Sequence, residues 1–573
     1  MTELRVWAPR ARGVDVLFAE SSVPMTRRDG DWFVAPVERA GDYRFGLDAG
    51  PPRPDPRSPW QPDGVDGPSR TVDHADFVWT DASWRGFPLP AACIYELHIG
   101  TFTDEGTFEA AIGRLDHLVS LGVNAIELMP VAEFPGTRGW GYDGVDLYAP
   151  HHAYGGPDGL KRLVDAAHAR GLAVICDVVY NHLGPAGNYL REFGPYFTDR
   201  YSTPWGDAIN LDGPGSGEVR AFIVDNALMW LRDYHFDGLR IDAIHAILDT
   251  SAVHILEEIA LGVRELEAGL GRTLWVIAES DLNDPRVVWE RTRGGYALDA
   301  QWSDDFHHSL FALITGDRSG YYIDFGRVEH LAAALQRAFV YDGRYSEYRT
   351  RHHGRSTESL SGNRFLGYLQ NHDQVGNRAR GDRTSALVSP ELLKVGAALV
   401  LTSPFVPMLF MGEEWGATTP FLYFTDHDPE LGRAVSDGRK RELAAFGWAP
   451  EDVPDPQDPA TFEASRLNWD ELGEVRHADL FEWHRRLIAL RRELPGLTDG
   501  RMDRVKTRHS EEPPWLVVER GDVTIACNFS SIEVDAPVRS GGRELLLTST
   551  KDPEPRGDDV RLGPESVAIF QTG

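Results

Sequence analysis

The sequence predicts a parallel (β/α)8 barrel, the TIM-barrel class, with a β domain on either side of it. Three observations predict this: eight strand-like apolar runs between residues 93 and 413, helical stripes of apolar residues among them, and short β-type runs near both ends of the chain. An open doubly wound sheet is the structural alternative, but the sequence lacks a Gly-x-Gly-x-x-Gly string after the first strand. The barrel is therefore the better prediction.

The two flanking regions are expected to be β-sandwiches. In the N-terminal region, residues 1–87, short β-rich runs are separated by turn residues and lie at 14–20, 31–38 and 42–49. A proline- and glycine-rich stretch at 51–68 is predicted to be an ordered connection. In the C-terminal region, residues 496–573, strand-like runs lie at 515–519, 523–529 and 567–570.

The middle of the chain, residues 88–495, is predicted to form the barrel with insertions. Apolar residues with helical spacing lie at 109–122, 158–171 and 219–230. The eight strand-like runs lie between and after these stripes, at 93–98, 125–130, 172–179, 238–242, 274–279, 297–303, 365–373 and 406–413.

Charge and cysteine content exclude several classes of function. With 58 Lys and Arg against 88 Asp and Glu, the net charge is −30, which repels nucleic acid and anionic membranes but leaves neutral partners such as sugars open. Three separated cysteines predict buried free thiols, not a disulfide framework. Residues 1–6 do not resemble a signal peptide, and two prolines interrupt the apolar segment 395–412, so a cytoplasmic protein with a buried core segment is expected.

Acidic and basic side chains gather where the predicted strands end. In a parallel barrel these ends share one mouth. Taken singly, Asp242 or Asp373 could cap a helix, and His182 or His372 could be structural. If these residues lie together, they form a buried carboxylate cluster, which costs free energy unless the pKa values of its members differ. Such differences in pKa are typical of catalytic sites. Paired carboxylates without a phosphate cradle or thiol nucleophile indicate glycoside hydrolysis.

The order of these strand-end strings resembles the α-amylase superfamily, glycoside hydrolase family 13. The matching strings are 177–182, 238–242, Glu279 and 371–373, and the resemblance spans nearly the whole chain, including an immunoglobulin-like, carbohydrate-module-like N-terminal sandwich. Longer strings are similar to a subfamily that cuts the α-1,4 bond beside the terminal trehalose of maltooligosyltrehalose; they lie at 61–69, 95–102, 241–247, 278–286 and 302–308. The resemblance therefore implies release of trehalose in trehalose biosynthesis.

Two alternatives remain open at this point. A glycogen branching enzyme shares the same carboxylates and the opening string 5–9, and differs only in using a glucan hydroxyl, not water, as acceptor. A non-catalytic glucan-binding protein is the other alternative, although such a protein would normally have lost Asp242 or Glu279, and both are present.

The resemblance implies a role for each acidic strand-end residue. Asp242 would be the nucleophile, Glu279 the general acid and base, and Asp373 a ligand for sugar hydroxyls whose charge keeps Glu279 protonated. Retention of configuration requires the two catalytic carboxyl groups to lie about 5–5.5 Å apart.

The resemblance also implies substrate-binding residues and no cofactor. Tyr142 would stack beneath the ring at the cleavage point, while His182 and His372 would bind its hydroxyls. Arg240, two residues before Asp242 on the same strand face, would keep that nucleophile ionised. Where α-amylases usually carry Lys-His, this chain has His245 and Ala246, so His245 and, less directly, Asp281 are expected on the leaving-group side.

No metal or obligate protein partner is expected. Many amylases bind calcium through the asparagine of the first motif, which is Asn181 in this chain. A calcium site needs six to eight oxygen ligands, and the sequence does not identify such a set. We expect Asn181 to hold loops by hydrogen bonds instead.

Overall fold

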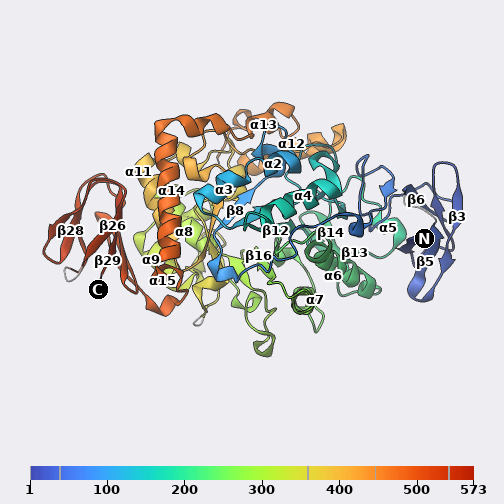
Figure 1. The fold of residues 1–573 in the computed structure, drawn as a ribbon, viewed down its shortest axis with the longest axis horizontal. Coiled ribbons are helices and arrows are strands. Elements are labelled where there is room, and N and C mark those ends of the chain that lie inside the picture. The colour runs from blue at the N-terminus through green and yellow to red at the C-terminus, as the bar shows by residue number, and fades with distance from the viewer. Residues whose placement is uncertain (1, 38–40, 358–359, 445–446, 540–542, 573) are drawn as a thin grey trace.

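The fold is an eight-stranded barrel between two β-rich regions, as the computed structural model shows along the long axis of the molecule (Figure 1). The structure describes residues 2–37, 41–357, 360–444, 447–539 and 543–572. The chain runs from the N-terminal sheets through the barrel to the C-terminal sheets, so the two termini lie at opposite ends.

All eight predicted barrel strands are present, each inside the run that predicted it. They are parallel and close into a ring in the order β12-β15-β16-β17-β20-β21-β8-β9. Every residue of these strands is buried, which is why they appear in the sequence as apolar runs and not as alternating patterns. Their bounds are β8 Ile94–Leu97, β9 Ala125–Leu128, β12 Ala173–Val178, β15 Gly238–Ile241, β16 Trp275–Ala278, β17 Ala300–Trp302, β20 Phe365–Gly367 and β21 Val406–Phe410.

Helices follow the strands around the ring. The expected single helix at 109–122 is wrong: the chain forms two helices, because Gly113 caps the first by donating to the carbonyls of Ala110 and Ala111. The main helices are α2 Phe108–Ile112, α3 Leu115–Leu121, α4 Gly156–His168, α6 Ser216–Asp233, α7 Ile255–Leu270, α8 Asp304–Thr315, α9 Val328–Arg337, α11 Pro390–Thr402, α12 Pro429–Ala444 and α14 Val475–Glu493.

The N-terminal region consists of two antiparallel sheets. One sheet has the order β1-β5-β4 and the other β3-β2-β6-β7. Apolar side chains of both sheets, such as Val6, Phe33, Val16 and Phe45, belong to one buried cluster, as in a sandwich. The bounds are β1 Thr2–Trp7, β2 Val14–Leu17, β3 Ser22–Pro24, β4 Thr26–Arg27, β5 Trp32–Val37, β6 Asp42–Leu47 and β7 Ser69–Arg70.

The C-terminal region is also built from two sheets, of order β22-β23-β24-β29-β26 and β25-β28-β27. Val517 and Phe570 of the first sheet share a buried cluster with Ala536 and Val560 of the second. The bounds are β22 Val505–Glu511, β23 Pro514–Arg520, β24 Val523–Asn528, β25 Val534–Pro537, β26 Glu544–Thr548, β27 Glu554–Arg556, β28 Asp559–Leu562 and β29 Ser566–Gln571. The boundaries at 87 and 495 stay predictions.

Three antiparallel hairpins are inserted after barrel strands. They are β10 Ala132–Glu133 with β11 Asp146–Pro150, β13 Phe197–Thr203 with β14 Gly206–Ile209, and β18 Asp342–Ser346 with β19 Arg351–Gly354. The loop at 134–145 joins the first pair and carries Trp140, Tyr142 and Asp143, which line the same cleft.

The expectations of a buried apolar segment at 395–412 and of buried free cysteines are confirmed. Residues 395–412 are buried and divide into the end of α11, a turn and β21. Within the described part of the chain, no helix combines the length and the apolar character needed to cross a membrane. Cys93, Cys176 and Cys527 are free and buried.

Candidate active site

The predicted strand ends meet on one rim of the barrel. Asp177 and Arg240 are register partners on β12 and β15. Asp242 and Glu279 directly follow the last residues of β15 and β16, which are themselves register partners. Because parallel strands present their carboxyl ends at the same mouth, the two carboxylates lie side by side above the barrel.

The guanidinium of Arg240 is the centre of the cluster. It is completely buried, and its Nη1 donates to Oδ2 of Asp177 at 2.6 Å and to Oδ1 of Asp242 at 2.8 Å. Its Nη2 lies 3.8 Å from Oε2 of Glu279, and its carbon lies 4.4 Å from the ring centre of Trp302. A buried cation needs such compensation, and this one holds the nucleophile and acid candidates on the same side of the mouth.

The carboxylate of Asp242 is fixed from two sides. Arg240 binds one oxygen, and the amide of Asn181 donates to the other at 2.7 Å and to the backbone carbonyl of Asp242 at 3.0 Å. Asn181 thus binds both the side chain and the backbone of Asp242. The next residue, Ala243, has a left-handed backbone with φ 38°, a conformation of the kind that gathers at functional sites. Its N–H donates to Oε2 of Glu279 at 2.6 Å.

The surroundings of Glu279 favour its protonated form. Burial raises the pKa of Glu279 well above its usual range, and the nearby carboxylates of Asp242, Asp304 and Asp373 raise it further, against the opposing effect of Arg240. Burial also raises the pKa of Asp304, to about 6. A carboxyl group kept neutral at neutral pH can act as a general acid.

A chain of hydrogen bonds runs beneath the cleft from Glu96 to Asp177. Nδ1 of His372 lies 2.5 Å from Oε1 of Glu96, and Nε2 of His372 lies 2.7 Å from the hydroxyl of Tyr142, which donates to Asp177 at 2.7 Å. Burial acts to lower the pKa of His372, but the carboxylates of Glu96 and Asp373 outweigh it and raise that pKa to about 9. A doubly protonated imidazole satisfies both of its contacts.

The structure brings most of the predicted site residues together at one cleft of about 530 Å³. Arg240 and His372 lie just beneath its lining, with 0% and 1% of their surfaces exposed, and act through the residues that face the cleft. The predicted residues that line it are Tyr142, His182, Asp242, His245, Glu279 and Asp373.

Asp281 lies at the edge of this group. Its Oδ1 is 3.9 Å from Nδ1 of His245, which lines the cleft. Its Oδ2 accepts a hydrogen bond from Nη1 of Arg349 at 2.9 Å. Asp281 is therefore connected to the cleft through His245.

The strand expected at 365–373 is too long, which changes the placement of Asp373. β20 ends at Gly367, and Asp373 lies in the short helix α10, His372–Gly376. The side chain of Asn371, and not that of Asp373, caps this helix by accepting from the N–H of Gln374. The carboxylate of Asp373 is thereby free to face the cleft, and 41% of its side chain is exposed.

Several cleft residues were not identified from the sequence. Trp205, at the turn of the β13–β14 hairpin, stacks on His182 with ring centres 4.3 Å apart. Helix α12 contributes Arg439 and Glu442. These residues lie in an inserted hairpin and on the charge-rich helix α12, where no apolar pattern marks them. Glu96, which lies beneath the cleft, has one detectable signal: it is a charged residue within an otherwise apolar strand.

The cleft continues into a second hollow of about 230 Å³. The two share Asn377 and Glu442. Four aromatic side chains contribute to the lining of the second hollow: Tyr321, Tyr322, Tyr348 and Trp448. Such rings offer flat apolar faces to which sugars can be stacked.

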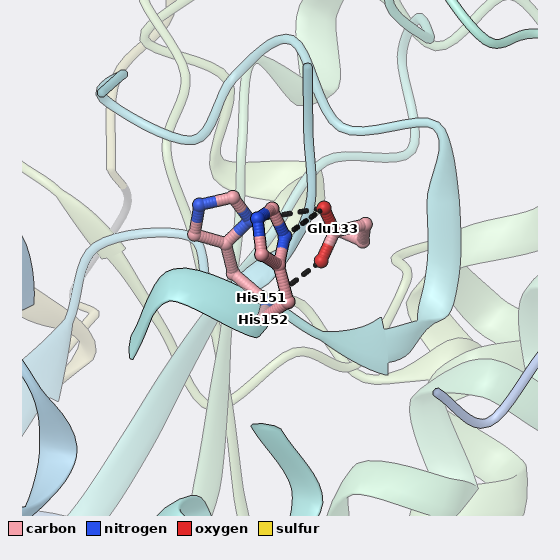
Figure 2. A group of neighbouring side chains, drawn as sticks. All are labelled: Glu133, His151 and His152. Carbon is pink, nitrogen blue, oxygen red and sulfur yellow. Dashed lines mark hydrogen bonds and ion pairs between the residues drawn. The ribbon is translucent and has the colours of Figure 1, made fainter. Parts of the chain in front are cut away.

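A separate group has the residue types of a metal site. Side-chain ligand atoms of Glu133, His151 and His152 lie within 4.8 Å of one another, at the base of the loop 134–145 (Figure 2). None of the three lines the catalytic cleft.

Comparisons with known proteins agree with this geometry. A family model described as the alpha amylase catalytic domain matches residues 74–202, and a domain of unknown function, DUF3459, matches residues 501–569. A crystal structure of an α-amylase candidate from Salmonella typhimurium is 39% identical with a TM-score of 0.92, covering 100% of this chain and 97% of its own.

The sequence relatives are more specific. The malto-oligosyltrehalose trehalohydrolase of Mycobacterium tuberculosis is 48% identical over 100% of this chain and 99% of its own. The protein of that name from Arthrobacter ramosus is 54% identical over 86% and 87% of the two chains. A 1,4-alpha-glucan branching enzyme from Corynebacterium jeikeium is only 27% identical, over 72% of this chain and 60% of its own. The chain belongs to the malto-oligosyltrehalose trehalohydrolase family, within the α-amylase superfamily.

Proposed function

We propose that the protein is a retaining glycoside hydrolase that cleaves the α-1,4-glucosidic bond next to the terminal trehalose of maltooligosyltrehalose. The products are trehalose and a maltooligosaccharide, which gives the enzyme a place in trehalose biosynthesis. The observation that carries this proposal is the contact of one buried guanidinium, Arg240, with both Asp242 and Glu279 at a single cleft.

The reaction proceeds in two displacements. First, a carboxylate oxygen of Asp242 attacks the anomeric carbon while Glu279 gives its proton to the glycosidic oxygen, so that trehalose leaves and a β-glucosyl ester forms. Second, Glu279 takes a proton from water, the resulting oxygen attacks the same carbon, and Asp242 departs. Two inversions restore the α configuration. The raised pKa of Glu279 suits its first role as acid.

The surrounding side chains position the sugar ring at the cleavage point. Tyr142 offers its ring face, and His182 and Asp373 face the cleft with groups that bind hydroxyls. His372 acts from beneath through the hydroxyl of Tyr142. Because these groups are held by hydrogen bonds before substrate arrives, they stabilise the transition state without having to reorganise.

The second hollow is proposed to receive the trehalose end. It adjoins the cleft through Asn377 and Glu442. His245 and Asp281 lie on the leaving-group side in this arrangement. An aromatic-lined hollow beyond the scissile bond gives a reason for cleavage at the terminal disaccharide and not at internal bonds.

The test is incubation of the purified protein with maltooligosyltrehalose, followed by chromatography of the products. Free trehalose and a shortened maltooligosaccharide are expected, with product from the Glu279→Gln variant reduced at least about 100-fold. A parallel incubation with amylose addresses the branching-enzyme alternative, which the 27% relative supports less well. New α-1,6 branches from amylose, with no trehalose from the first substrate, would overturn the proposal.

A cytoplasmic location is part of the proposal. The three cysteines are buried and unpaired, as is usual in proteins of reducing compartments. Fractionation of cells with antibody detection should find the protein with soluble cytoplasmic markers; recovery with secreted proteins would contradict the assignment.

A further inference from the structure

The cluster of Glu133, His151 and His152 lies where one loop of the cleft begins and ends. Glu133 is the last residue of β10, and the two histidines directly follow β11, its antiparallel partner. The loop 134–145 between them carries Tyr142 and other residues that line the cleft. Whatever holds these three side chains together therefore holds both ends of that loop.

His151 is buried with its ring nitrogens poorly satisfied. Its surface is 0% exposed, and its ring stacks on Phe134 with centres 3.7 Å apart. Nδ1 lies 3.3 Å from Oε1 of Glu133, but neither ring nitrogen makes a well-aligned hydrogen bond to any described residue. An unsatisfied buried polar group costs free energy and calls for an explanation.

The three side chains converge on a common point, as Figure 2 shows. Nδ1 of His151 lies 3.3 Å from Oε1 of Glu133, and Nδ1 of His152 lies 2.7 Å from the same oxygen. The second oxygen of Glu133 accepts the backbone N–H of His152 at 2.8 Å, which fixes the orientation of the carboxylate. Two imidazole nitrogens thus face one carboxylate oxygen.

These distances are close to those of a zinc site. Ligand atoms bound tetrahedrally at about 2.0–2.2 Å lie roughly 3.4 Å from one another. The contact of His151 with Glu133, at 3.3 Å, is near that separation, and the contact of His152, at 2.7 Å, would need to open by about 0.7 Å. The side chain of His152 is 24% exposed, so the cluster can be reached from solvent on that side.

We propose that Glu133, His151 and His152 form a structural binding site for a divalent cation of zinc type. Two imidazoles and one carboxylate are ligands that zinc accepts readily, and a calcium or magnesium ion would instead need more oxygen ligands. The ion would fix the base of the loop that carries Tyr142. It takes no part in the reaction, and the inference does not depend on which glucan the cleft accepts.

The test uses the full-length protein after dialysis against a chelator and then against chelator-free buffer. Titration with zinc sulfate in a calorimeter should show one high-affinity site per chain, and zinc should raise the melting temperature. His152→Gln and Glu133→Gln should each weaken that affinity at least about tenfold and abolish the rise. His509→Gln, which removes an exposed imidazole in the C-terminal sheet, should leave both readouts unchanged.

X-ray absorption spectroscopy of the zinc-loaded protein identifies the ligands. We expect a spectrum that is fitted by two imidazole ligands together with oxygen ligands. Wild-type protein that binds zinc no more tightly than the His152→Gln variant, or whose melting temperature zinc does not raise, would overturn the proposal. If the Glu133→Gln variant does not fold, the comparison of zinc affinity rests on the wild type and the His152→Gln variant, because His152 is partly exposed. Chromatography of trehalose release is a separate assay, so failure of one proposal is distinguishable from failure of the other.

Discussion

The two ends of the barrel each hold a buried charged cluster, and the clusters differ in how their charges are balanced. At the amino-terminal end, His168 of α4 lies between two carboxylates, 2.8 Å from Oδ2 of Asp81 and 2.9 Å from Oδ2 of Asp237. Asp81 has a second imidazole partner in His235 at 2.8 Å. Asp237 also accepts from the indole of Trp84 at 2.7 Å.

At the carboxyl-terminal mouth, one guanidinium contacts three carboxylates. Arg240 contacts Asp177, Asp242 and Glu279, and the charge of Asp373 lies near enough to Glu279 to shift its pKa. Negative charge therefore exceeds positive charge there. The surplus disfavours ionisation of Glu279, the most weakly compensated of the three, which keeps its proton.

The pKa directions express the same difference. Burial acts to raise the pKa of Asp81, but the hydrogen bonds of His168 and His235 hold it well below its usual range. Burial raises the pKa of Glu279, and its carboxylate neighbours reinforce the effect. Where each carboxylate has a basic partner, the cluster stabilises the fold. Where negative charge is in surplus, a carboxyl group stays protonated and can act as an acid. The variants described next separate these two functions.

Replacing Glu279 with Gln should have the largest effect on activity. The amide keeps the shape of the side chain and can still accept the N–H of Ala243, but it has no proton to give. We expect kcat to fall by about 10²–10⁴-fold, while the melting temperature stays at or above that of the wild type. Steady-state kinetics and a thermal melt of the same preparation measure both. Activity within a few-fold of wild type would show that another group is the acid.

Replacing Asp237 with Ala should have the opposite signature. Removing one member of a buried ion pair leaves His168 short of a partner and should lower the free energy of unfolding by about 3–5 kcal/mol. The kcat of the folded protein should remain near the wild-type value, because Asp237 lies at the far end of the barrel. Denaturant titration gives the first quantity. A large loss of kcat without loss of stability would erase the contrast between the two ends.

Replacing Glu96 with Gln tests how charge reaches the cleft from beneath. The pKa of His372 is raised to about 9 in the folded protein, above the value of about 6.5 for an unperturbed histidine. Its stabilising contribution is therefore fully present below about pH 6.5 and is lost as the pH rises through about 9. The variant should lose roughly 3 kcal/mol at most, measured at pH 6.

The deficit of the Glu96→Gln variant should shrink when melting temperatures are compared at pH 6, 7.5 and 9.5. A deficit that does not change with pH would mean that Glu96 stabilises the fold by packing and not by pairing with a protonated His372.

Replacing Asp304 with Asn should have the smallest effect, on the pH profile. Asp304 is one of the carboxylates that raise the pKa of Glu279, and it is itself ionised above about pH 6. Without it, Glu279 should lose its proton at lower pH. The alkaline limb of kcat/KM should then move downward by about half a pH unit. A limb that moves upward, or not at all, would contradict the assignment of that limb to Glu279.

Much of the fold could be predicted because barrel strands are buried on both faces and leave uninterrupted apolar runs. The break at Gly113 cannot be predicted from the apolar period, which continues through it from Ile112 to Leu115. The end of β20 is hidden for a related reason, since Tyr368 and Leu369 are buried although they no longer belong to the strand.

The site was predictable only in part. Asp242 and Glu279 follow strands directly, so their positions depend on local order alone. Trp205 reaches the cleft, and Tyr321 and Trp448 reach the second hollow, from long insertions. Their approach depends on tertiary contacts that no local pattern encodes. The convergence of Glu133 on His151 similarly depends on pairing between two short strands.

Mass spectrometry of a trapped intermediate tests most directly whether Asp242 is the nucleophile. The Glu279→Gln variant is incubated with an α-maltosyl fluoride, whose fluoride leaves without an acid, and is then digested at low pH. We expect a maltosyl adduct on the peptide that contains Asp242, and on the carboxyl group of that residue. Adduct formation at another residue, or turnover of the fluoride to a β-configured product with no adduct, would contradict it.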